Sequence, residues 1–439
     1  MNWRRYLIIL AAAGSLSSCL FDLKYTVGGN LAGLEGSGLV LENNSGDALT
    51  FTADGAFTFS TSIAKGGTYS VTVTTQPSNP AQTCVVHNGT GTMGSTDVVN
   101  VVVNCTQAGR FAYVANQAAN TVSGYAIDAG NGFLTPLTDS PFALNGTSPQ
   151  AAVVEPNGAY LYVVNNGSND VSVFAINYAS GTLTAAGVAI LAGNAPSAIA
   201  IDPSNRYLYV TNSTDNTVSA YTLSNGTATP ISGSPYPVGQ KPYSVQTDPG
   251  GNYLYVANYT DGTVSAFVID PASGALTTMA GSPFGAGAGA IALAIDPTGT
   301  FAFVANETAA TISSYSITAD AGTLVPLTGS PQATGSSPES LVVNPGGSFL
   351  YAANVTGVND VAAYTITPST GALTLGTPVG AGTLPISAAM DAAGTFVYVA
   401  NDTSDDVSVF AVNAATGALT QVAGSPFAAG AGARAIAID

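Results

Sequence analysis

Short segments in which apolar and polar positions alternate run through most of the chain, and clusters of Gly, Asn, Asp and Pro separate them. The clearest group covers residues 198–223. It contains an apolar run at 198–201, a segment with aromatic residues at alternate positions at 207–211, and a third segment at 217–223. A period of two residues is typical of β-strands, and the polar clusters are typical of turns. The pattern therefore predicts three consecutive strands.

This group of strands recurs seven times along the chain. An Asn residue ends the second predicted strand of every copy, and by subtraction successive copies lie 46 to 49 residues apart, at Asn116, Asn165, Asn212, Asn258, Asn306, Asn354 and Asn401. We expect a fourth strand in the Gly-x-Leu-Thr segment of each copy, for example 274–278, before a Gly-Ser-Pro-aromatic connection such as 281–284. A repeat of this length with about four strands is typical of a β-propeller. The sequence thus predicts an all-β chain with a seven-bladed propeller at residues 106–439.

The two ends of the repeat array predict how the ring closes. Apolar runs precede six of the seven second strands and end at Glu155, Asp202, Asp248, Asp296, Asn344 and Asp391. The first such strand, at 111–115, has no apolar run before it, whereas the run AIAID stands alone at 435–439. We therefore expect residues 435–439 to form the innermost strand of the first blade, which would leave no free sheet edge.

The N-terminal segment 1–19 has the pattern of an export signal. Arg4 and Arg5 precede an apolar run at 7–14 that is too short to span a bilayer. Leu-Ser-Ser-Cys at 16–19 resembles the bacterial lipobox, in which the Cys is acylated. The interpretation is a lipid anchor on Cys19 and a place in the bacterial cell envelope, periplasmic or on the cell surface. The alternative is an ordinary secretory signal with an incidental Cys.

The sequence pattern predicts a separate small domain at residues 20–105. Its short alternating segments, divided by Gly, Asn and Asp turns, suggest a β-sandwich of about seven strands that acts as a spacer or interaction module. With Cys19 used for lipidation, Cys84 and Cys105 remain as a pair in an oxidising compartment, and we expect them to form a disulfide. These two Cys and the lone His87 lack the four-ligand spacing of a zinc site.

Charge excludes several classes of partner. The 439 residues contain 8 Lys and Arg against 25 Asp and Glu, which gives a net charge of −17. Binding to nucleic acid or to an anionic membrane surface requires clustered basic side chains. We therefore expect no nucleic-acid partner and membrane contact only through the N-terminal anchor. Acidic loops such as 402–406 lack the residue spacing of a calcium loop, so we expect no metal and no cofactor.

The repeats separate structural positions from candidate site positions, because a residue present in all copies serves the blade and a site must be asymmetric. The Asn series is interpreted as Asx turns, and Glu155 with the Asp series as caps of the following turns. The first variable position, after the Pro or Ala that opens each inner strand, is Arg434, Gln150, Ser197, Tyr243, Ile291, Glu339 or Ile386. The second, after the shared Asn, is Gln117, Asn166, Ser213, Tyr259, Glu307, Val355 or Asp402. We expect both sets at one mouth of the central channel, with Lys241 in an adjacent loop. The alternative interpretation is ordinary solvated loop residues.

The Tyr-Val-Ala/Thr-Asn repeats, the Asp-Pro-x-Gly turns and the seven units resemble the lactonase-like seven-bladed propellers, the family of phosphogluconolactonases and surface YVTN-repeat proteins. Enzymes of that family carry G-P-R-H-x-x-F-H-P followed by Y-x-x-N-E. The corresponding blade reads GAIALAIDP at 289–297 and FVANE at 303–307. Glu307 matches the family Glu, whereas Ile291, Ala292 and Asp296 replace the Arg and the two His. Arg434 retains an Arg in the first blade, again followed by Ala rather than His.

The resemblance implies a lactonase in which Glu307 is catalytic, but the missing His residues remove the usual base. The propeller also contains only four basic side chains to hold a phosphate, at Arg110, Arg206, Lys241 and Arg434. The sequence therefore favours an envelope-anchored propeller that binds a small molecule or an envelope protein without family-type catalysis. The proposed ligand-binding residues are Arg434, Glu339, Tyr243, Lys241 and Asp402. The alternative is hydrolysis of a sugar or acyl lactone at Glu307, and the sequence leaves open whether the protein is an enzyme.

Overall fold

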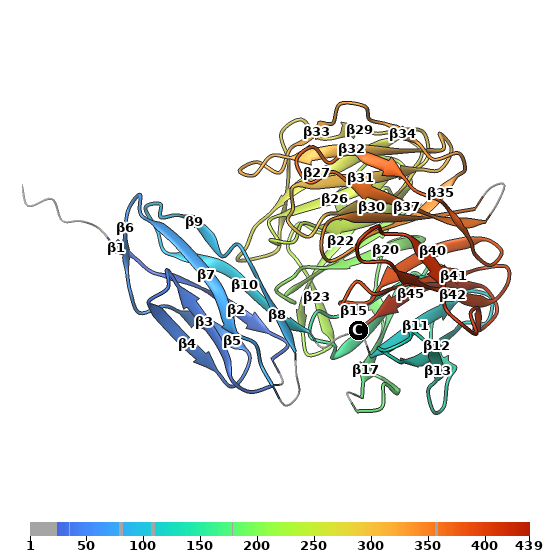
Figure 1. Cartoon of the computed structure of the whole chain (residues 1–439), viewed down its shortest axis with the longest axis horizontal. Coiled ribbons are helices and arrows are strands. Elements are labelled where there is room, and N and C mark those ends of the chain that lie inside the picture. Colours follow the sequence, from blue (N-terminus) through green and yellow to red (C-terminus); the bar gives the residue numbers. More distant parts are fainter. Residues whose placement is uncertain (1–23, 35, 79–81, 107–109, 178, 356–358) are drawn as a thin grey trace, which may run out of the picture.

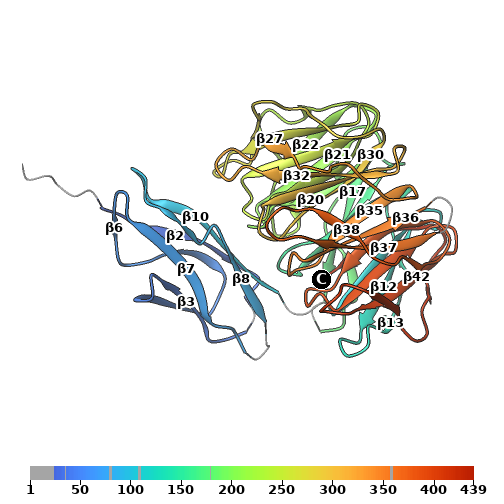
Figure 2. The same ribbon diagram turned by 45° about the horizontal axis from the view of Figure 1, so that its top comes forward.

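The computed structural model describes residues 24–439 except 35, 79–81, 107–109, 178 and 356–358 (Figure 1). Its described residues form strands and turns and no helix. A small sandwich, coloured blue, lies to one side of a larger ring of sheets in both Figure 1 and Figure 2. The predicted signal segment and its lipidation site, Cys19, lie outside the described residues. None of the described segments is a helix that could cross a membrane.

The ring contains seven blades, each a four-stranded antiparallel sheet, as predicted. From the channel outwards, the first four blades are β45 (Ala433–Ile438), β11 (Phe111–Asn116), β12 (Thr121–Ile127) and β13 (Leu134–Pro136); β15 (Pro149–Val154), β16 (Tyr160–Asn165), β17 (Asp170–Ile176) and β18 (Leu183–Ala185); β20 (Pro196–Ile201), β21 (Tyr207–Asn212), β22 (Thr217–Ser224) and β23 (Thr227–Pro230); and β25 (Pro242–Thr247), β26 (Tyr253–Asn258), β27 (Thr263–Ile269) and β28 (Leu276–Thr278). The other three are β30 (Ala290–Ile295), β31 (Phe301–Asn306), β32 (Thr311–Ile317) and β33 (Leu324–Pro326); β35 (Pro338–Val343), β36 (Phe349–Asn354), β37 (Asp360–Ile366) and β38 (Leu373–Leu375); and β40 (Pro385–Met390), β41 (Phe396–Asn401), β42 (Asp406–Val412) and β43 (Leu419–Gln421).

The Gly-Ser-Pro-aromatic connections add a feature that the sequence pattern did not predict. In each blade a two-residue strand after the fourth strand returns to pair with the start of the third. These short strands are β14 (Phe142–Ala143), β19 (Ile190–Leu191), β24 (Tyr236–Pro237), β29 (Phe284–Gly285), β34 (Gln332–Ala333), β39 (Val379–Gly380) and β44 (Phe427–Ala428).

The last strand closes the ring, as the sequence predicted. β45 pairs antiparallel with β11, so the first blade combines the two ends of the repeat array. Beyond β45, an Asp439 carboxylate oxygen accepts hydrogen bonds from the backbone N–H groups of Arg110 at 2.7 Å and Phe111 at 2.8 Å. The closure therefore joins residues more than 300 positions apart in the sequence.

The second strands hold neighbouring blades together because their side chains are buried on both faces. The Tyr209 hydroxyl reaches the next blade and donates to the carbonyl of Gly274 at 3.0 Å. Tyr113 donates in the same way to Gly181 at 2.8 Å, and a Cβ on Gly181 would lie 2.4 Å from the Phe111 ring. Each apolar cluster of the ring accordingly contains side chains from two neighbouring blades. Both faces of a blade are dry, which explains the nearly continuous apolar strands.

The shared Asn residues are structural, but they do not form the expected Asx turns. The Asn306 amide nitrogen donates to the hydroxyls of Thr311 at 3.0 Å and Ser313 at 2.9 Å, both on the facing third strand. Its oxygen accepts from the backbone N–H of Gly287, ahead of the inner strand, at 2.9 Å. Asn306 thus connects three segments of its own blade rather than closing a local turn, and Asn116 and Asn212 make the same set of contacts.

The Asp residues after the inner strands cap turns, as predicted. In the fifth blade one Asp296 oxygen accepts from the backbone N–H groups of Thr300 at 2.7 Å and Phe301 at 2.6 Å. Glu155 is an exception, because its longer carboxylate accepts from the Tyr162 hydroxyl at 2.7 Å and the Asn205 amide at 3.2 Å. The expectation that Glu155 caps its turn like the Asp series is therefore corrected.

The smaller unit has more strands than the predicted seven. Its strands are β1 (Lys24–Tyr25), β2 (Val27–Ala32), β3 (Leu39–Asn43), β4 (Asp47–Phe51), β5 (Gly55–Thr58), β6 (Ile63–Ala64), β7 (Thr68–Thr75), β8 (Thr83–His87), β9 (Thr90–Thr92) and β10 (Val98–Thr106). Two four-stranded sheets, β5-β2-β10-β8 and β4-β3-β7-β9, enclose one apolar core, and β1 pairs with β6. Cys84 and Cys105 lie opposite each other on β8 and β10 and are disulfide-bonded, as predicted.

The small unit contacts the propeller at the ends of the inner strands that carry the turn caps. The Asn88 amide donates to the backbone carbonyl of Gly250 at 2.9 Å. His87 and Asn88 also face Asp248 and Thr298 across a cleft between the two parts. The small unit thus lies against part of the face that carries the Asp-capped turns, at the third, fourth and fifth blades.

Candidate functional site

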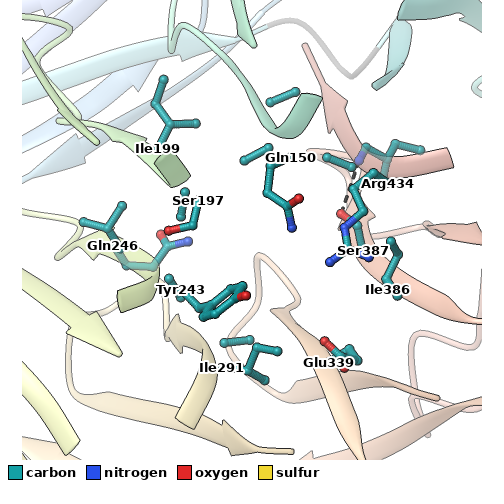
Figure 3. A pocket seen from close by; sticks show the side chains of 18 residues that line it. Gln150, Ser197, Ile199, Tyr243, Gln246, Ile291, Glu339, Ile386, Ser387 and Arg434 are labelled. Atoms are coloured by element: carbon teal, nitrogen blue, oxygen red, sulfur yellow. Dashed lines mark hydrogen bonds between the residues drawn. The ribbon is translucent and has the colours of Figure 1, made fainter. Parts of the chain in front are cut away.

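A cavity of about 210 Å³ lies in the central channel at the opening ends of the inner strands. Its lining contains every residue of the first variable set, namely Gln150, Ser197, Tyr243, Ile291, Glu339, Ile386 and Arg434 (Figure 3). The expectation that these positions ring one mouth of the channel is therefore confirmed.

A β-bulge explains why this position reaches the channel in every blade. In β25, Pro242 pairs with Asn258 and Ser244 pairs with Ala257, so Tyr243 between them has no residue opposite. The same register shift occurs at the start of the inner strand of all seven blades. Bulges redirect side chains and are common beside functional sites. The structure thus presents six kinds of side chain, with Ile in two of the seven blades, on one repeated backbone feature.

Arg434 occupies one side of the cavity in a polar network. Its Nη1 atom is 3.9 Å from an Asp402 carboxylate oxygen. The Gln150 amide is oriented with its oxygen toward the Arg434 guanidinium. In this orientation the oxygen accepts from Nε at 3.0 Å and from Nη2 at 2.9 Å. The other end of that amide lies 3.0 Å from the amide of Gln117. Burial raises the pKa of Asp402, and the positive charge of Arg434 acts in the opposite direction. The Arg434 charge is therefore partly balanced before any ligand arrives.

Two tyrosines and a carboxylate form the opposite side. The rings of Tyr243 and Tyr259 lie 5.6 Å apart between centroids and are inclined by 59°. The Tyr259 hydroxyl donates to Glu307 at 2.8 Å, and the Thr308 hydroxyl donates to the same carboxylate oxygen at 3.0 Å. The Lys241 ammonium lies 4.9 Å from the Tyr259 ring centroid and 5.3 Å from that of Tyr243. This side of the mouth is therefore aromatic and acidic.

Glu339 is the titratable group that the geometry perturbs most clearly within this site. It lines the cavity from the bulge that opens β35. Burial and the negative charge of Glu307 raise its pKa to about 7, against the opposing effect of Arg434. A carboxyl group with that pKa exists in both protonation states at neutral pH, which is useful in a binding or proton-transfer site.

The structure separates the predicted site residues into two groups. Arg434, Glu339 and Tyr243 line the cavity, whereas Glu307, Lys241 and Asp402 lie at its rim and act on the lining residues. Sequence reasoning placed Gln150 and Tyr259 among the variable positions but did not select them. Their polar contacts with Arg434 and Glu307 could not be inferred without the register of the blades.

The structure also shows where the residues lie that stand in place of the family's Arg and His. Ile291, Ala292 and Ala435 line the cavity where the resemblance implies Arg and His. Asp296 is buried at the opposite end of β30 and caps its turn, so it contributes nothing to this cavity. Residues 106–439 contain no His at all.

The cavity serines serve the inner strands rather than forming a nucleophilic site. Ser387 accepts a hydrogen bond from the backbone N–H of Ile436 in the next blade at 3.2 Å (Figure 3). Ser244 accepts from Leu293 at 3.2 Å, and Ser197 donates to the backbone carbonyl of Pro242 in the next blade at 2.6 Å. A nucleophilic serine requires an adjacent base, which these contacts do not supply. In the described part of the chain, no three His, Cys, Asp or Glu side chains gather as a metal site.

Comparisons with known proteins agree with this architecture. The sequence profile of the family described as "Lactonase, 7-bladed beta-propeller" matches residues 68–196, 188–289 and 278–433. A candidate 6-phosphogluconolactonase from Bacteroides uniformis is 19% identical with a TM-score of 0.67, and the alignment covers 76% of this chain and 100% of that one. A periplasmic gluconolactonase from Pseudomonas aeruginosa is 21% identical with a TM-score of 0.64, over 73% and 96% of the two chains. No curated protein matches the sequence. At these identities the solved structures establish the fold alone.

Proposed function

Because the chain belongs to the seven-bladed β-propeller lactonase family, we propose that it binds a small, non-phosphorylated, hydroxyl-rich ligand at the mouth of its central channel. The observation that carries the proposal is the convergence of the bulged residues of all seven blades on one cavity. A residue needed only by the blade would be the same in every blade, whereas six residue types occur at this position, with Ile in two blades. The bulge is a backbone feature that all blades share, whereas the side chain at the bulge differs between blades and can contact a ligand.

The lining indicates the size and chemistry of the ligand. At about 210 Å³ the cavity is smaller than the roughly 300–1,000 Å³ of pockets for drug-sized molecules. Gln150, Tyr243, Glu339 and Arg434 provide donors and acceptors around it, while Ile291 and Ile386 supply apolar wall. A single sugar ring, which presents hydroxyl groups at its edge and C–H groups on its faces, suits that combination.

Charge argues against a phosphorylated ligand. Arg434 is the single cationic residue of the cavity lining, and Asp402 and Gln150 already engage it. Glu339 and Glu307 would repel a phosphate, and the whole chain carries a net charge of −17. Phosphate sites use several charge-assisted hydrogen bonds. The proposed ligand therefore differs from a 6-phosphogluconolactone.

A second candidate function is hydrolysis of an unphosphorylated lactone, favoured by Glu339. With a pKa of about 7, its carboxylate can accept a proton from water at neutral pH while the water oxygen attacks the lactone carbonyl carbon. The Arg434 guanidinium would stabilise the negative charge that develops on the carbonyl oxygen. As the carbonyl re-forms, the ring C–O bond would break and the leaving oxygen would take the proton that Glu339 had accepted. Glu307 would act through Tyr259 and through its effect on Glu339. The sequence had assigned the catalytic role to Glu307 itself.

The test is a calorimetric and turnover assay on the mature protein with D-glucono-1,5-lactone, its 6-phosphate and acyl lactones. Glu339→Gln and Glu307→Gln are the site variants, and Glu42→Gln on β3 of the small unit is the control. Saturable binding of non-phosphorylated sugars without turnover supports the binding function. Turnover that disappears in Glu339→Gln establishes the hydrolase. Preferential binding of the 6-phosphate contradicts both.

The place of the protein in the cell is part of the proposal. The lipobox-like segment at 16–19 supports cleavage before Cys19 and acylation of that residue, with the propeller outside the cytoplasm. Intact-mass spectrometry of the protein from a bacterial membrane fraction should give a diacylated or triacylated N-terminus at Cys19. A mature N-terminus elsewhere, or a chain without lipid, contradicts the anchor.

A further inference from the structure

We propose that Tyr243, Tyr259 and Glu307 form a subsite for the cationic group of a ligand held in the cavity, and that Lys241 fills this subsite in the free protein. The inference rests on the proposed function, since it concerns the mouth of the same cavity. It narrows the ligand to amine-bearing small molecules such as amino sugars and amino alcohols.

The two tyrosine rings have the arrangement that holds a cation. They are inclined by 59° with centroids 5.6 Å apart, so their faces form an open wedge at the rim. The electron-rich faces of aromatic rings attract ammonium groups within about 6 Å of the centroid. The Lys241 ammonium lies within that range of both rings, at 4.9 and 5.3 Å. The protein's own side chain thus shows which chemical group the wedge accepts.

The carboxylates next to the wedge reinforce this preference. The Tyr259 hydroxyl donates to Glu307, which fixes the ring and places a negative charge beside it. Glu339 lines the adjoining part of the cavity, and its negative charge and that of Glu307 act on each other. A cation bound between them would relieve that repulsion.

Lys241 is placed so that a ligand can displace its ammonium group. Its backbone is fixed, because its N–H donates to Asn216 at 2.8 Å and its carbonyl accepts from the Tyr259 N–H at 3.0 Å. Its side chain is exposed, and among the described residues no carboxylate lies within ion-pairing distance of it. A flexible, exposed ammonium held only by two aromatic faces can leave at little energetic cost.

The experiment uses choline as the cationic probe and 3,3-dimethylbutan-1-ol, which has the same shape and no charge, as its control. Both are titrated into the whole mature protein and into Lys241→Met, which keeps the apolar stem and removes the competing charge. We expect Lys241→Met to bind choline about tenfold more tightly than the unmodified protein does, a gain consistent with one cation–π contact. Introducing Tyr259→Leu or Glu307→Gln into that variant should remove the gain, and the neutral alcohol should not discriminate between the proteins.

The outcomes distinguish the subsite from the proposed function. Equal binding of choline and the neutral alcohol by Lys241→Met overturns the subsite, whether or not the unmodified protein binds sugars. Binding of choline together with failure to bind any sugar or lactone supports the subsite and contradicts the proposed function. Thermal unfolding of each variant, expected to match the unmodified protein, shows that a loss of binding is local.

Discussion

The pKa of the Glu339 carboxyl group depends on its burial and on two neighbouring charges of opposite sign. Burial and Glu307 disfavour its charged form, and Arg434 favours it. These effects depend on side chains from three different blades, β35, the loop after β31, and β45. The sequence identified all three residues as variable positions, because they differ between repeats. It could not predict the pKa, since that depends on distances set by the ring closure.

At this scale we predict how the pKa of Glu339 responds to each neighbour. Glu307→Gln should lower the pKa from about 7, because it removes a repelling negative charge. Arg434→Met should raise it, because it removes a stabilising positive charge. A carbon-detected NMR titration of the Glu339 side-chain carboxyl measures both shifts, with Glu42→Gln as the control. Shifts of the same sign in both variants would refute this account of the site.

The position of the first variable set at the channel was predicted from the sequence, and the bulges explain it, whereas the roles of these residues stay predictions. Residues after the opening Pro or Ala were expected at the channel because they vary, and Arg434, Glu339 and Tyr243 do line it. The loop residue Glu307 was expected to act directly, and the structure places it at the rim behind Tyr259. An extra unpaired residue in a strand leaves no trace in the apolar pattern, so the sequence could not distinguish the cavity lining from the rim.

At the scale of the element, five of the inner strands end in a turn that one Asp or Asn side chain caps. The sixth blade uses Asn344 at the position where other blades use Asp, and its oxygen accepts from Ser348 at 2.8 Å and from Phe349 at 2.7 Å. Asp391 makes the equivalent bonds to Thr395 at 2.8 Å and Phe396 at 2.6 Å. The chain itself thus shows that the cap requires an acceptor and no charge.

Asp391→Asn should therefore keep the turn, and Asp391→Ala should lose it. Burial raises the pKa of Asp391, so its ionised form opposes folding increasingly as the pH rises through that pKa. We expect Asp391→Asn to be at least as stable as the unmodified protein at pH 8, with a smaller advantage at pH 4. Asp391→Ala should lower the free energy of unfolding by about 1–3 kcal/mol, because two backbone donors lose their acceptor. Chemical denaturation at both pH values tests this, and an Asn variant as unstable as the Ala variant would contradict it.

The period of the sequence predicted the strands well, because each blade is buried on both faces and repeats one apolar pattern. The role of the shared Asn was misjudged, since its partners lie on the facing strand. In the third blade Asn212 donates to Thr217 and Ser219, whose positions follow from strand pairing. The returning two-residue strands were missed because two residues are too short to show a period.

At the scale of the whole molecule, the last strand closes the seven blades into one ring. β45 supplies the inner strand of the first blade and also carries Arg434, so closure and site formation depend on the same segment. The prediction from the sequence was correct because one apolar run was missing at the start of the array and one was left over at its end. The contact of the small unit with the capped turns was not predictable from either pattern.

Removing β45 should therefore damage both stability and the site. A chain ending at residue 432 should melt at a lower temperature and aggregate, because β11 would present an unpaired edge. A chain lacking only Asp439 loses three terminal hydrogen bonds and keeps the strand, so its melting temperature should decrease much less. Scanning calorimetry and light scattering compare the two, and equal effects would mean that the strand itself does not close the ring.

The central claim is that the channel mouth is the binding site, and a cavity-filling variant tests it most directly. Ile386 lines the cavity and carries no charge, so Ile386→Trp fills the space without altering the electrostatics. Calorimetric titration of D-glucono-1,5-lactone, or of whichever sugar of the panel binds best, should give saturable binding to the unmodified protein. We predict at least a tenfold loss of affinity in Ile386→Trp with an unchanged melting temperature, since tenfold corresponds to about 1.4 kcal/mol of lost contact. Unchanged affinity in a folded Ile386→Trp variant would place the ligand elsewhere and contradict the account.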